Sequence, residues 1–232
     1  RGKGLEKLAD DLNIVMTSVA EIKAYIREKQ ELKLEATGPV KLPSDYGNFT
    51  AYGFIDPDNG KDHIALVKGD IKGDNILTRI HSECLTGDVL GSRRCDCGNQ
   101  LHKALREIEE NGQGILLYMR QEGRGIGLFN KLKAYKLQEE GLDTVDANRE
   151  LGFPDDMRDY RIACEILKKL GVRSVRLMTN NPDKVEQIEK YGIKVDERYP
   201  LEIKSNDEDR KYLHTKVVRM GHELEVKERK NA

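Results

Sequence analysis

Three of the four cysteines in this chain of 232 residues lie close together in the sequence. Ten residues separate Cys84 from Cys95, and one residue separates Cys95 from Cys97. In an extended segment, side chains two positions apart point to the same side, so Cys95 and Cys97 are predicted to face one ion while Asp96 points away. Such clustering in a chain with few cysteines indicates a metal site before it indicates a disulfide.

The number of ligands decides what such a metal could do. Three protein ligands leave a fourth tetrahedral position for water, which distinguishes a catalytic zinc from a closed structural one. A catalytic zinc lowers the pKa of that water to about 7. A structural site is the alternative, and it would need a fourth ligand such as His81 or His102. Cys164 falls on the apolar face of a predicted helix, so we expect it to be buried and inert.

A glycine-rich turn follows the apolar run at residues 115–119. Residues 120–127 read Arg-Gln-Glu-Gly-Arg-Gly-Ile-Gly and precede a predicted helix, whose start would favour an anion. Arg120 and Arg124 are suited to phosphate. The spacing matches neither a Walker loop nor a Rossmann fingerprint, so an ordinary strand-to-helix turn is the alternative.

Two further polar segments precede predicted helices. One contains Asp156 and Arg158, and the other contains Thr179 and Lys184. Both fit ordinary helix capping equally well, and an ion pair between Asp156 and Arg158 on the surface would contribute little to stability. Taken singly, neither segment predicts a function.

The elements that must position these residues alternate between strand and helix patterns. Strands are predicted at residues 49–54, 64–67, 76–81, 115–119, 174–178 and 193–195, and helices at 101–108, 128–135, 163–170 and 182–188. The fold class is therefore α+β (mixed α/β), with a mixed sheet and flanking helices. A short helical extension precedes this domain, since Leu5, Leu8 and Leu12 share one helical face and Ser18 and Glu21 form a capping box.

Composition excludes some function classes. The 40 basic and 41 acidic residues give a formal net charge of -1, which argues against a uniformly basic nucleic-acid partner. No apolar run approaches the roughly 20 residues of a membrane helix, so no membrane partner is expected. The chain does not begin with Met, and we therefore expect a piece of a longer protein.

Taken together and in order, these segments resemble GTP cyclohydrolase II. The matching text is Arg-Ile-His-Ser-Glu-Cys-Leu-Thr-Gly-Asp at 79–88, Arg-Cys-Asp-Cys-Gly at 94–98, Gln-Glu-Gly-Arg at 121–124, the loop with Asp156 and Arg158, and Thr-Asn-Asn-Pro at 179–182. The resemblance implies a GTP cyclohydrolase II-like domain at residues 44–232.

The segments before that domain carry a separate expectation. Residues 1–33 resemble the tail of dihydroxybutanone-phosphate synthase, so they are expected to be the C-terminal remnant of such a domain, or else a helical extension. The charged stretch at 34–43 is expected to be a linker.

The resemblance also implies a role for each matching position. The metal ligands would be Cys84, Cys95 and Cys97, with one Zn²⁺ per subunit. The catalytic residues would be Asp156 as proton acceptor, Arg158 as nucleophile and Tyr135 beside the reacting base. The GTP-contacting residues would be Arg79, Ile80, His81, Ser82, Glu83, Gln100, Glu122, Gly123, Arg124, Thr144, Thr179 and Lys184. A guanidinium is ordinarily protonated, so electrostatic stabilisation at phosphate is the plainer role for Arg158.

The implied reaction is zinc-dependent hydrolysis of GTP to a diaminopyrimidinone ribosylamine phosphate, formate and pyrophosphate, the first step of riboflavin biosynthesis. Mg²⁺ would be held mainly by the substrate phosphates. The resemblance further implies a cytoplasmic homodimer, and Glu122 is the candidate acceptor for the N–H edge of guanine. Three alternatives are an inactive GTP-binding regulatory paralogue, a zinc module that binds nucleic acid, and a partial enzyme that retains the formyl group.

Overall fold

The computed structural model describes residues 3–29, 32–203 and 208–222. The chain divides into two compact units, one ending at Lys33 and the other beginning at Leu34. Each unit is considered by itself below.

The N-terminal unit consists of two short helices, α1 (Lys3–Leu12) and α2 (Val19–Lys29). The capping box predicted before α2 is confirmed. The backbone N–H of Ser18 donates to Glu21 Oε2 at 2.6 Å, and the N–H of Glu21 donates to Ser18 Oγ at 3.1 Å. These reciprocal bonds satisfy two donors that the start of a helix leaves unpaired.

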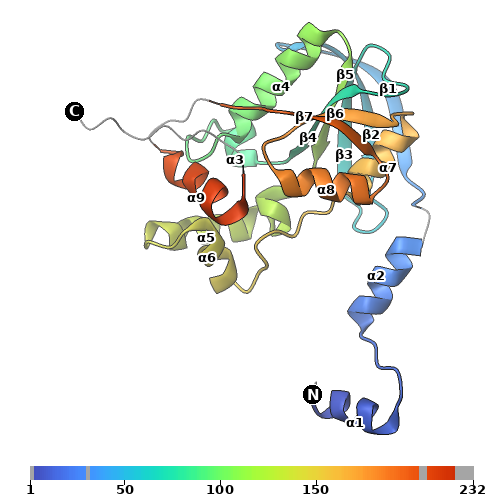
Figure 1. Cartoon of the computed structure of the whole chain (residues 1–232). Coiled ribbons are helices and arrows are strands. Elements are labelled where there is room, and N and C mark those ends of the chain that lie inside the picture. Colours follow the sequence, from blue (N-terminus) through green and yellow to red (C-terminus); the bar gives the residue numbers. More distant parts are fainter. Residues whose placement is uncertain (1–2, 30–31, 204–207, 223–232) are drawn as a thin grey trace. The chain divides into compact units, whose positions relative to one another are not determined.

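The larger unit is a mixed sheet with flanking helices, which confirms the predicted fold class (Figure 1). Its strands are β1 (Glu35–Ser44), β2 (Gly47–Ile55), β3 (Asp62–Lys68), β4 (Ile76–Ser82), β5 (Gly114–Met119), β6 (Ser174–Met178) and β7 (Lys194–Tyr199). Its helices are α3 (Leu85–Asp88), α4 (Cys97–Asn111), α5 (Gly127–Glu139), α6 (Thr144–Glu150), α7 (Arg161–Lys169), α8 (Pro182–Lys190) and α9 (Arg210–Met220), with the short 3₁₀ turn η1 (Glu122–Gly125) before α5. The patterns predicted neither α6 nor α9.

The strands are ordered β1-β2-β3-β5-β4-β6-β7 across the sheet. The pairs from β1 to β5 are antiparallel, whereas β5, β4, β6 and β7 run parallel. The chain leaves β4 toward β5 on one side and later returns to β6 on its other side. Such a reversal of direction places a crevice at the carboxyl ends of the parallel strands, which is where α/β folds usually bind ligands.

The two crossovers cover opposite faces of the sheet. Leu77 of β4 and Leu116 of β5 pack with Leu105 and Ile108 of α4 in one core cluster. Right-handed crossovers that leave in opposite directions place their helices on opposite faces. The helices α7 and α8 accordingly lie on the other side of the sheet from α4 (Figure 1).

The expectation of a linker at residues 34–43 is wrong, because Glu35–Ser44 form β1 and pair with β2. The register shifts between Thr37 and Val40, which accommodates Pro39. An edge strand tolerates proline because one of its sides needs no ladder hydrogen bonds. Every residue of β1 is exposed, so the segment shows no alternating pattern from which a strand could be predicted.

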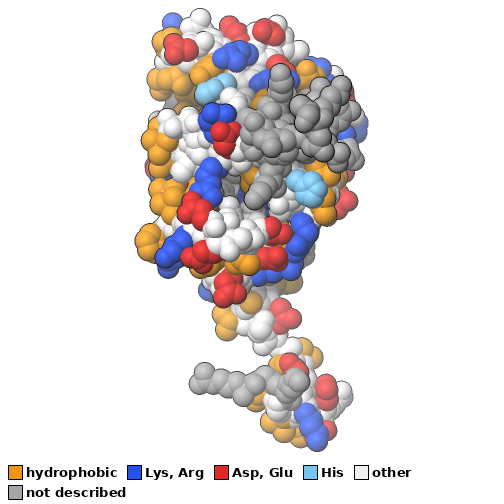
Figure 2. All heavy atoms as spheres, turned by 90° about the vertical axis from the view of Figure 1, so that its left-hand side faces the viewer, with side chains coloured by type: hydrophobic (Ala, Val, Ile, Leu, Met, Phe, Trp, Pro, Cys, Tyr) orange, Lys and Arg blue, Asp and Glu red, His pale blue; other side chains and the backbone are white. Residues whose placement is uncertain are grey.

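On the face drawn in Figure 2, basic and acidic side chains are interspersed over the surface. Among the described residues, no helix combines the length and the apolar character that crossing a bilayer requires.

Candidate active site

The site lies where three parallel strands end. Glu83 follows β4, Glu122 follows β5 and Thr179 follows β6, and all three line one pocket. The pocket contains about 1170 Å³ of empty space, its open mouth included. Sheet topology therefore brings together polar segments that lie far apart in the sequence.

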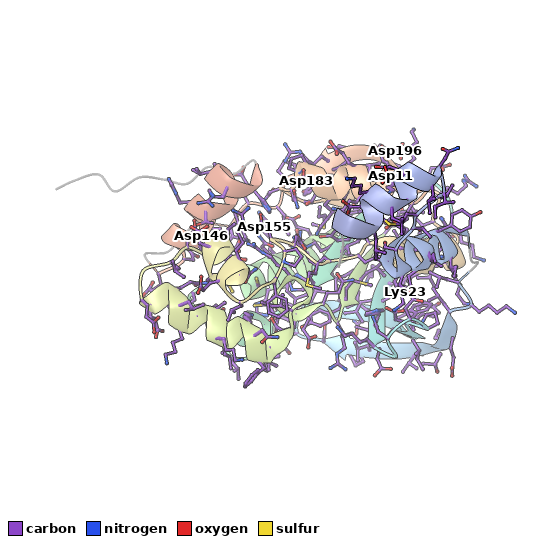
Figure 3. All side chains as sticks on the ribbon, turned by 90° about the horizontal axis from the view of Figure 1, so that it is seen from below. Asp11, Lys23, Asp146, Asp155, Asp183 and Asp196 are labelled. Carbon is purple, nitrogen blue, oxygen red and sulfur yellow. The ribbon has the colours of Figure 1, made fainter. Side chains whose placement is uncertain are left out.

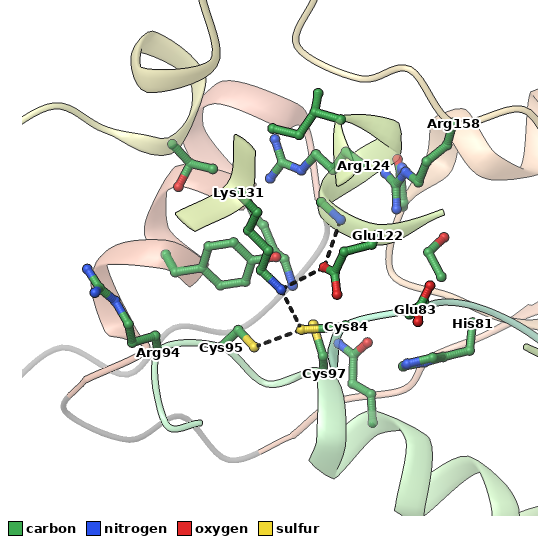
Figure 4. Close-up of a pocket in the computed structure, with 18 of the residues that line it drawn as sticks. His81, Glu83, Cys84, Arg94, Cys95, Cys97, Glu122, Arg124, Lys131 and Arg158 are labelled. Carbon is green, nitrogen blue, oxygen red and sulfur yellow. Dashed lines mark hydrogen bonds and ion pairs between the residues drawn. The ribbon is translucent and has the colours of Figure 1, made fainter. Parts of the chain in front are cut away.

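The three clustered cysteines meet at one end of this pocket (Figure 4). Their sulfur atoms all lie within 4.8 Å of one another, and the Sγ atoms of Cys84 and Cys95 are 3.6 Å apart. Two thiolates on a tetrahedral zinc, each at about 2.3 Å, would lie about 3.8 Å from each other. The donor set and its spacing therefore fit zinc.

A glycine keeps the space beside the sulfurs open. A Cβ at Gly87 would lie 3.0 Å from the Sγ of Cys95 and 3.1 Å from the Sγ of Cys84. Any larger residue would crowd both sulfur atoms. Close packing against the two sulfurs therefore explains why position 87 is a glycine.

The cysteines converge by a different local geometry from the one predicted. Asp96 has φ −93° and ψ 5°, and Cys97 is the first residue of α4, so the segment is not extended. Asp96 is buried and accepts hydrogen bonds from Lys216 Nζ at 2.8 Å and from Gln100 Nε2 at 2.5 Å. Helix initiation, rather than strand alternation, brings Cys95 and Cys97 to one side.

The three sulfurs share protons through hydrogen bonds to one another. The pKa of Cys84 is lowered because Cys95 and Cys97 donate hydrogen bonds to its sulfur, and the charge of Lys131 adds to the effect. The pKa of Cys95 is raised to about 11, chiefly by its hydrogen bond to Cys84. A bound metal would replace these shared protons.

Neither histidine considered as a fourth ligand joins the three sulfurs in the described part of the chain. His81 Nε2 lies 3.1 Å from both carboxylate oxygens of Asp88, and the His102 ring stacks on Tyr46. Cys164 is fully buried away from the cluster, as predicted, and burial raises its pKa to about 12. The arrangement favours the open, catalytic type of site.

Lys131 connects the cysteine centre to the glycine-rich turn, and the sequence patterns did not single it out. Its Nζ donates to Cys84 Sγ at 3.1 Å and to Glu122 Oε1 at 2.8 Å (Figure 4). It also donates to Thr86 Oγ1 at 3.1 Å. Glu122 also accepts from the backbone N–H of Leu85 at 2.7 Å. Both charged groups are thus held within a single network.

Tyr135 lies on the same helix, one turn further along. Its hydroxyl is 3.4 Å from Thr86 Oγ1, and the guanidinium of Arg94 lies 4.4 Å from its ring centroid. Burial raises the pKa of Tyr135, so the phenol stays protonated at neutral pH. It can therefore donate a hydrogen bond into the pocket beside the sulfurs.

The glycine-rich turn holds the loop that carries Arg158. Gly123 and Arg124 adopt left-handed conformations, with φ of 62° and 59°. The N–H of Met157 donates to the carbonyl oxygen of Arg124 at 3.0 Å, and a Cβ at Gly125 would lie 3.0 Å from the Met157 side chain. The close approach explains a glycine at that position.

Asp156 and Arg158 form a fork-like pair rather than a loose surface contact. Arg158 Nε donates to the two carboxylate oxygens at 2.9 and 3.0 Å, and its Nη2 donates to Oδ2 as well. The Arg158 side chain is only 15% exposed. Burial would raise the pKa of Asp156, but the hydrogen bonds and charge of Arg158 outweigh it and lower that pKa.

Two buried cations, Arg79 and Lys184, also line the pocket. Arg79 donates to the carbonyl oxygen of Met178 at 2.8 Å and to Gln100 at 2.7 Å. Lys184 Nζ donates to the carbonyl oxygen of Ile80 at 3.0 Å, and burial together with the charges of nearby arginines lowers its pKa. An anionic group bound here would relieve the repulsion between these cations.

The structure brings nearly all of the predicted site residues to this one pocket. Those that line it are Arg79, His81, Ser82, Glu83, Cys84, Cys95, Cys97, Gln100, Glu122, Gly123, Arg124, Tyr135, Thr144, Arg158, Thr179 and Lys184. Ile80, which is fully buried, lies outside the lining. Asp156, which is exposed and pairs with Arg158, lies outside it as well. Arg120, expected at phosphate, is also outside the lining and lies 3.7 Å from Glu83 Oε2.

The C-terminal helix adds residues that the sequence patterns missed. Tyr212, Lys216 and His222 line the pocket from α9 and the turn that follows it. Arg219 of α9 pairs with Asp143 and Asp146 at the start of α6 at 3.0 and 3.1 Å (Figure 3 labels Asp146). Nothing in the local pattern of α9 indicates contact with the cysteine segment.

Comparison with known proteins agrees with the resemblance that the sequence motifs indicated. The family model for GTP cyclohydrolase II matches residues 35–200. The riboflavin biosynthesis proteins RibBA of Bacillus cereus and of Bacillus mycoides are each 53% identical over 223 residues, covering 96% of this chain and 56% of theirs. The chain thus spans about half the length of these curated relatives.

A solved structure shares the fold at lower similarity. RibBX of A. baumannii, described as a two-domain 3,4-dihydroxy-2-butanone 4-phosphate synthase, superposes with a TM-score of 0.50 at 20% identity, covering 86% of this chain and 49% of that one. The fold, the ordered motifs and the family match agree, and the chain belongs to the GTP cyclohydrolase II family.

Proposed function

We propose that this domain hydrolyses GTP to a diaminopyrimidinone ribosylamine phosphate, formate and pyrophosphate, with one zinc ion held by Cys84, Cys95 and Cys97. One observation carries the proposal: three convergent thiols and a group of buried cations line the same pocket. That pairing suits a nucleotide whose base reacts at one end while its phosphates are held at the other. Zinc bound there would supply Lewis acidity for the hydrolysis at C8.

The buried cations would hold the triphosphate. Arg79, Lys184 and Arg158 supply charge there, and Mg²⁺ would travel with the phosphates rather than in a protein cage. Burial would lower the pKa of Arg158, but the charges of Tyr160 and Asp156 raise it above its ordinary value, so the guanidinium stays protonated. That supports electrostatic stabilisation at the α-phosphate over the nucleophilic role implied by the resemblance.

Glu122 would select the base. A carboxylate offers about four lone-pair sites, and Glu122 uses three of them for Leu85, Gly123 and Lys131. The remaining site can accept from the N–H edge of guanine, which adenine lacks. A buried group left unpaired by the wrong base costs about 1–3 kcal/mol.

The proposal extends to the setting of the domain. The protein would be a homodimer in the cytoplasm. The reducing conditions there would keep the three thiols available for metal. Residues 1–33 would belong to the C-terminal part of a dihydroxybutanone-phosphate synthase domain. The matches to RibBA support this, since they cover 96% of the chain and so reach beyond residues 35–200.

The test is incubation of the chain with GTP and Mg²⁺ before and after zinc chelation, with formate and pyrophosphate quantified. Release of both, lost on chelation and restored by zinc, is expected. Cys95→Ser should abolish formate release, whereas the matched control Cys164→Ser, at a cysteine outside the pocket, should retain it. Pyrophosphate or a formylated product without formate would indicate the partial enzyme, and binding of GTP without turnover would indicate the regulatory paralogue.

A further inference from the structure

Lys131 occupies a position that none of the roles assigned above explains. It projects from α5 between the cysteine centre and the glycine-rich turn (Figure 4). An ammonium group has three N–H donors, and each finds an acceptor here, namely Cys84 Sγ, Thr86 Oγ1 and Glu122 Oε1. The side chain is therefore fixed rather than free to sample solvent.

The ion pair between Lys131 and Glu122 is mostly buried, so each charge depends on its partner. The side chains of Lys131 and Glu122 are 12% and 8% exposed. A charge removed from water needs a partner of opposite sign and satisfied hydrogen bonds. Lys131 supplies an opposite charge and a hydrogen bond to the carboxylate of Glu122. It also donates a hydrogen bond to the sulfur of Cys84.

We propose that Lys131 is a positioning residue that holds the Cys84 sulfur and the Glu122 carboxylate in a fixed relation, so that metal binding and base recognition depend on one shared cation. This rests on the proposed function and deepens it. Groups that hydrogen-bond to metal ligands orient them, and their loss typically lowers metal affinity about 10- to 100-fold. The same loss would leave Glu122 held by backbone donors alone.

The first experiment measures zinc affinity of the whole chain by competition with a chromophoric chelator. Lys131→Met, which keeps the length of the side chain but removes the charge, should weaken zinc binding about 10- to 100-fold. The matched control is Lys133→Met on the same helix, since Lys133 is exposed and lies over the ring of Phe129. The proposal is overturned if both variants bind zinc equally well.

A spectroscopic reading separates positioning from general damage to the fold. Cobalt(II) substituted for zinc gives thiolate-to-metal charge-transfer absorption that responds to hydrogen bonds at sulfur. Lys131→Met should shift this band under conditions in which circular dichroism shows that the variant is folded, and Lys131→Arg should restore the band in part. An unshifted band would contradict a direct contact between Lys131 and the metal-binding sulfur.

The coupling itself is tested by combining Lys131→Met with Glu122→Gln. If one cation serves both groups, the loss of zinc affinity in the double variant should be smaller than the product of the two single losses. Losses that multiply would overturn the coupling. If the wild-type chain binds no zinc, the proposed function fails; if it binds zinc and releases formate while Lys131→Met binds as tightly, only this inference fails.

Discussion

Lys216 on the C-terminal helix donates a hydrogen bond to Asp96, the residue between two of the clustered cysteines, at 2.8 Å. Both side chains are almost fully buried. Burial would raise the pKa of Asp96, but the charge and hydrogen bond of Lys216 outweigh it and keep the carboxylate ionised. A helix outside the family-matched residues 35–200 is thereby hydrogen-bonded to the segment that carries the clustered cysteines.

We therefore expect Lys216→Met to be strongly destabilising. It strands Asp96 as a buried charge, which typically costs about 3–5 kcal/mol. Urea unfolding of the metal-free chain measures the loss. Lys168→Met is the control, since its pair with Glu165 is largely exposed and should contribute less than about 1 kcal/mol. Equal losses of unfolding free energy in the two variants would show that the buried pair stabilises the fold no more than the exposed one. Adding Asp96→Asn to Lys216→Met should recover part of the loss.

A second prediction concerns the glycine beside the sulfurs. Gly87→Ala would place a methyl group 3.0 Å from the Sγ of Cys95 and 3.1 Å from that of Cys84, so zinc affinity should fall by about tenfold or more. The loss of zinc affinity is measured as the amount of zinc per chain that atomic emission detects after dialysis. In Gly91→Ala the left-handed backbone costs about 1 kcal/mol, but no atom lies within 4 Å of the added carbon. That variant should keep its zinc, and if it loses zinc equally, loop strain rather than crowding is responsible.

The sequence predicted the cysteine cluster because cysteine is scarce and three lie within a short span. An apolar run likewise predicted β5, since buried parallel strands read as continuous apolar segments. The exposed strand β1 carries no such run and was missed.

Contacts made by common residue types were also missed. Lys131 is one of 40 basic residues in the chain, and its spacing along α5 gives no sign of the sulfur that it contacts. Lys216 and Asp96 lie 120 positions apart. Pairings at such separation depend on how the elements pack, which local patterns do not encode.

The third prediction tests the role of Arg158. Arg158→Lys keeps a positive charge but loses the planar fork that holds Asp156. Turnover of GTP should fall about 100-fold or more, the usual effect of removing a preorganised donor from a developing negative charge. Steady-state release of pyrophosphate measures it. Arg149→Lys is the control, because its partner Asp155 lies outside the pocket lining (Figure 3 labels Asp155). Wild-type turnover by Arg158→Lys would exclude both the electrostatic and the nucleophilic role.

The last prediction follows from the lowered pKa of Asp156. The ordinary aspartate value is about 3.9, so a lower value in the folded chain gives stability that is fully present above about pH 4. It is lost as pH falls through the folded value, because the unfolded chain takes up the proton first. Asp156→Asn cannot titrate, so the gap in unfolding free energy between wild type and variant should be constant from about pH 5 to 8 and close below about pH 4.

Urea unfolding of the metal-free chain across this range measures the gap without interference from acid release of zinc. Asp155→Asn serves as the comparison, since its pair with Arg149 is solvent-exposed and should weaken when salt screens it. The gap for Asp156→Asn should persist in salt because Arg158 is mostly buried. A gap that vanished in salt, or that widened as the pH fell below 4, would mean that the pair with Arg158 does not hold the carboxylate ionised in the folded protein.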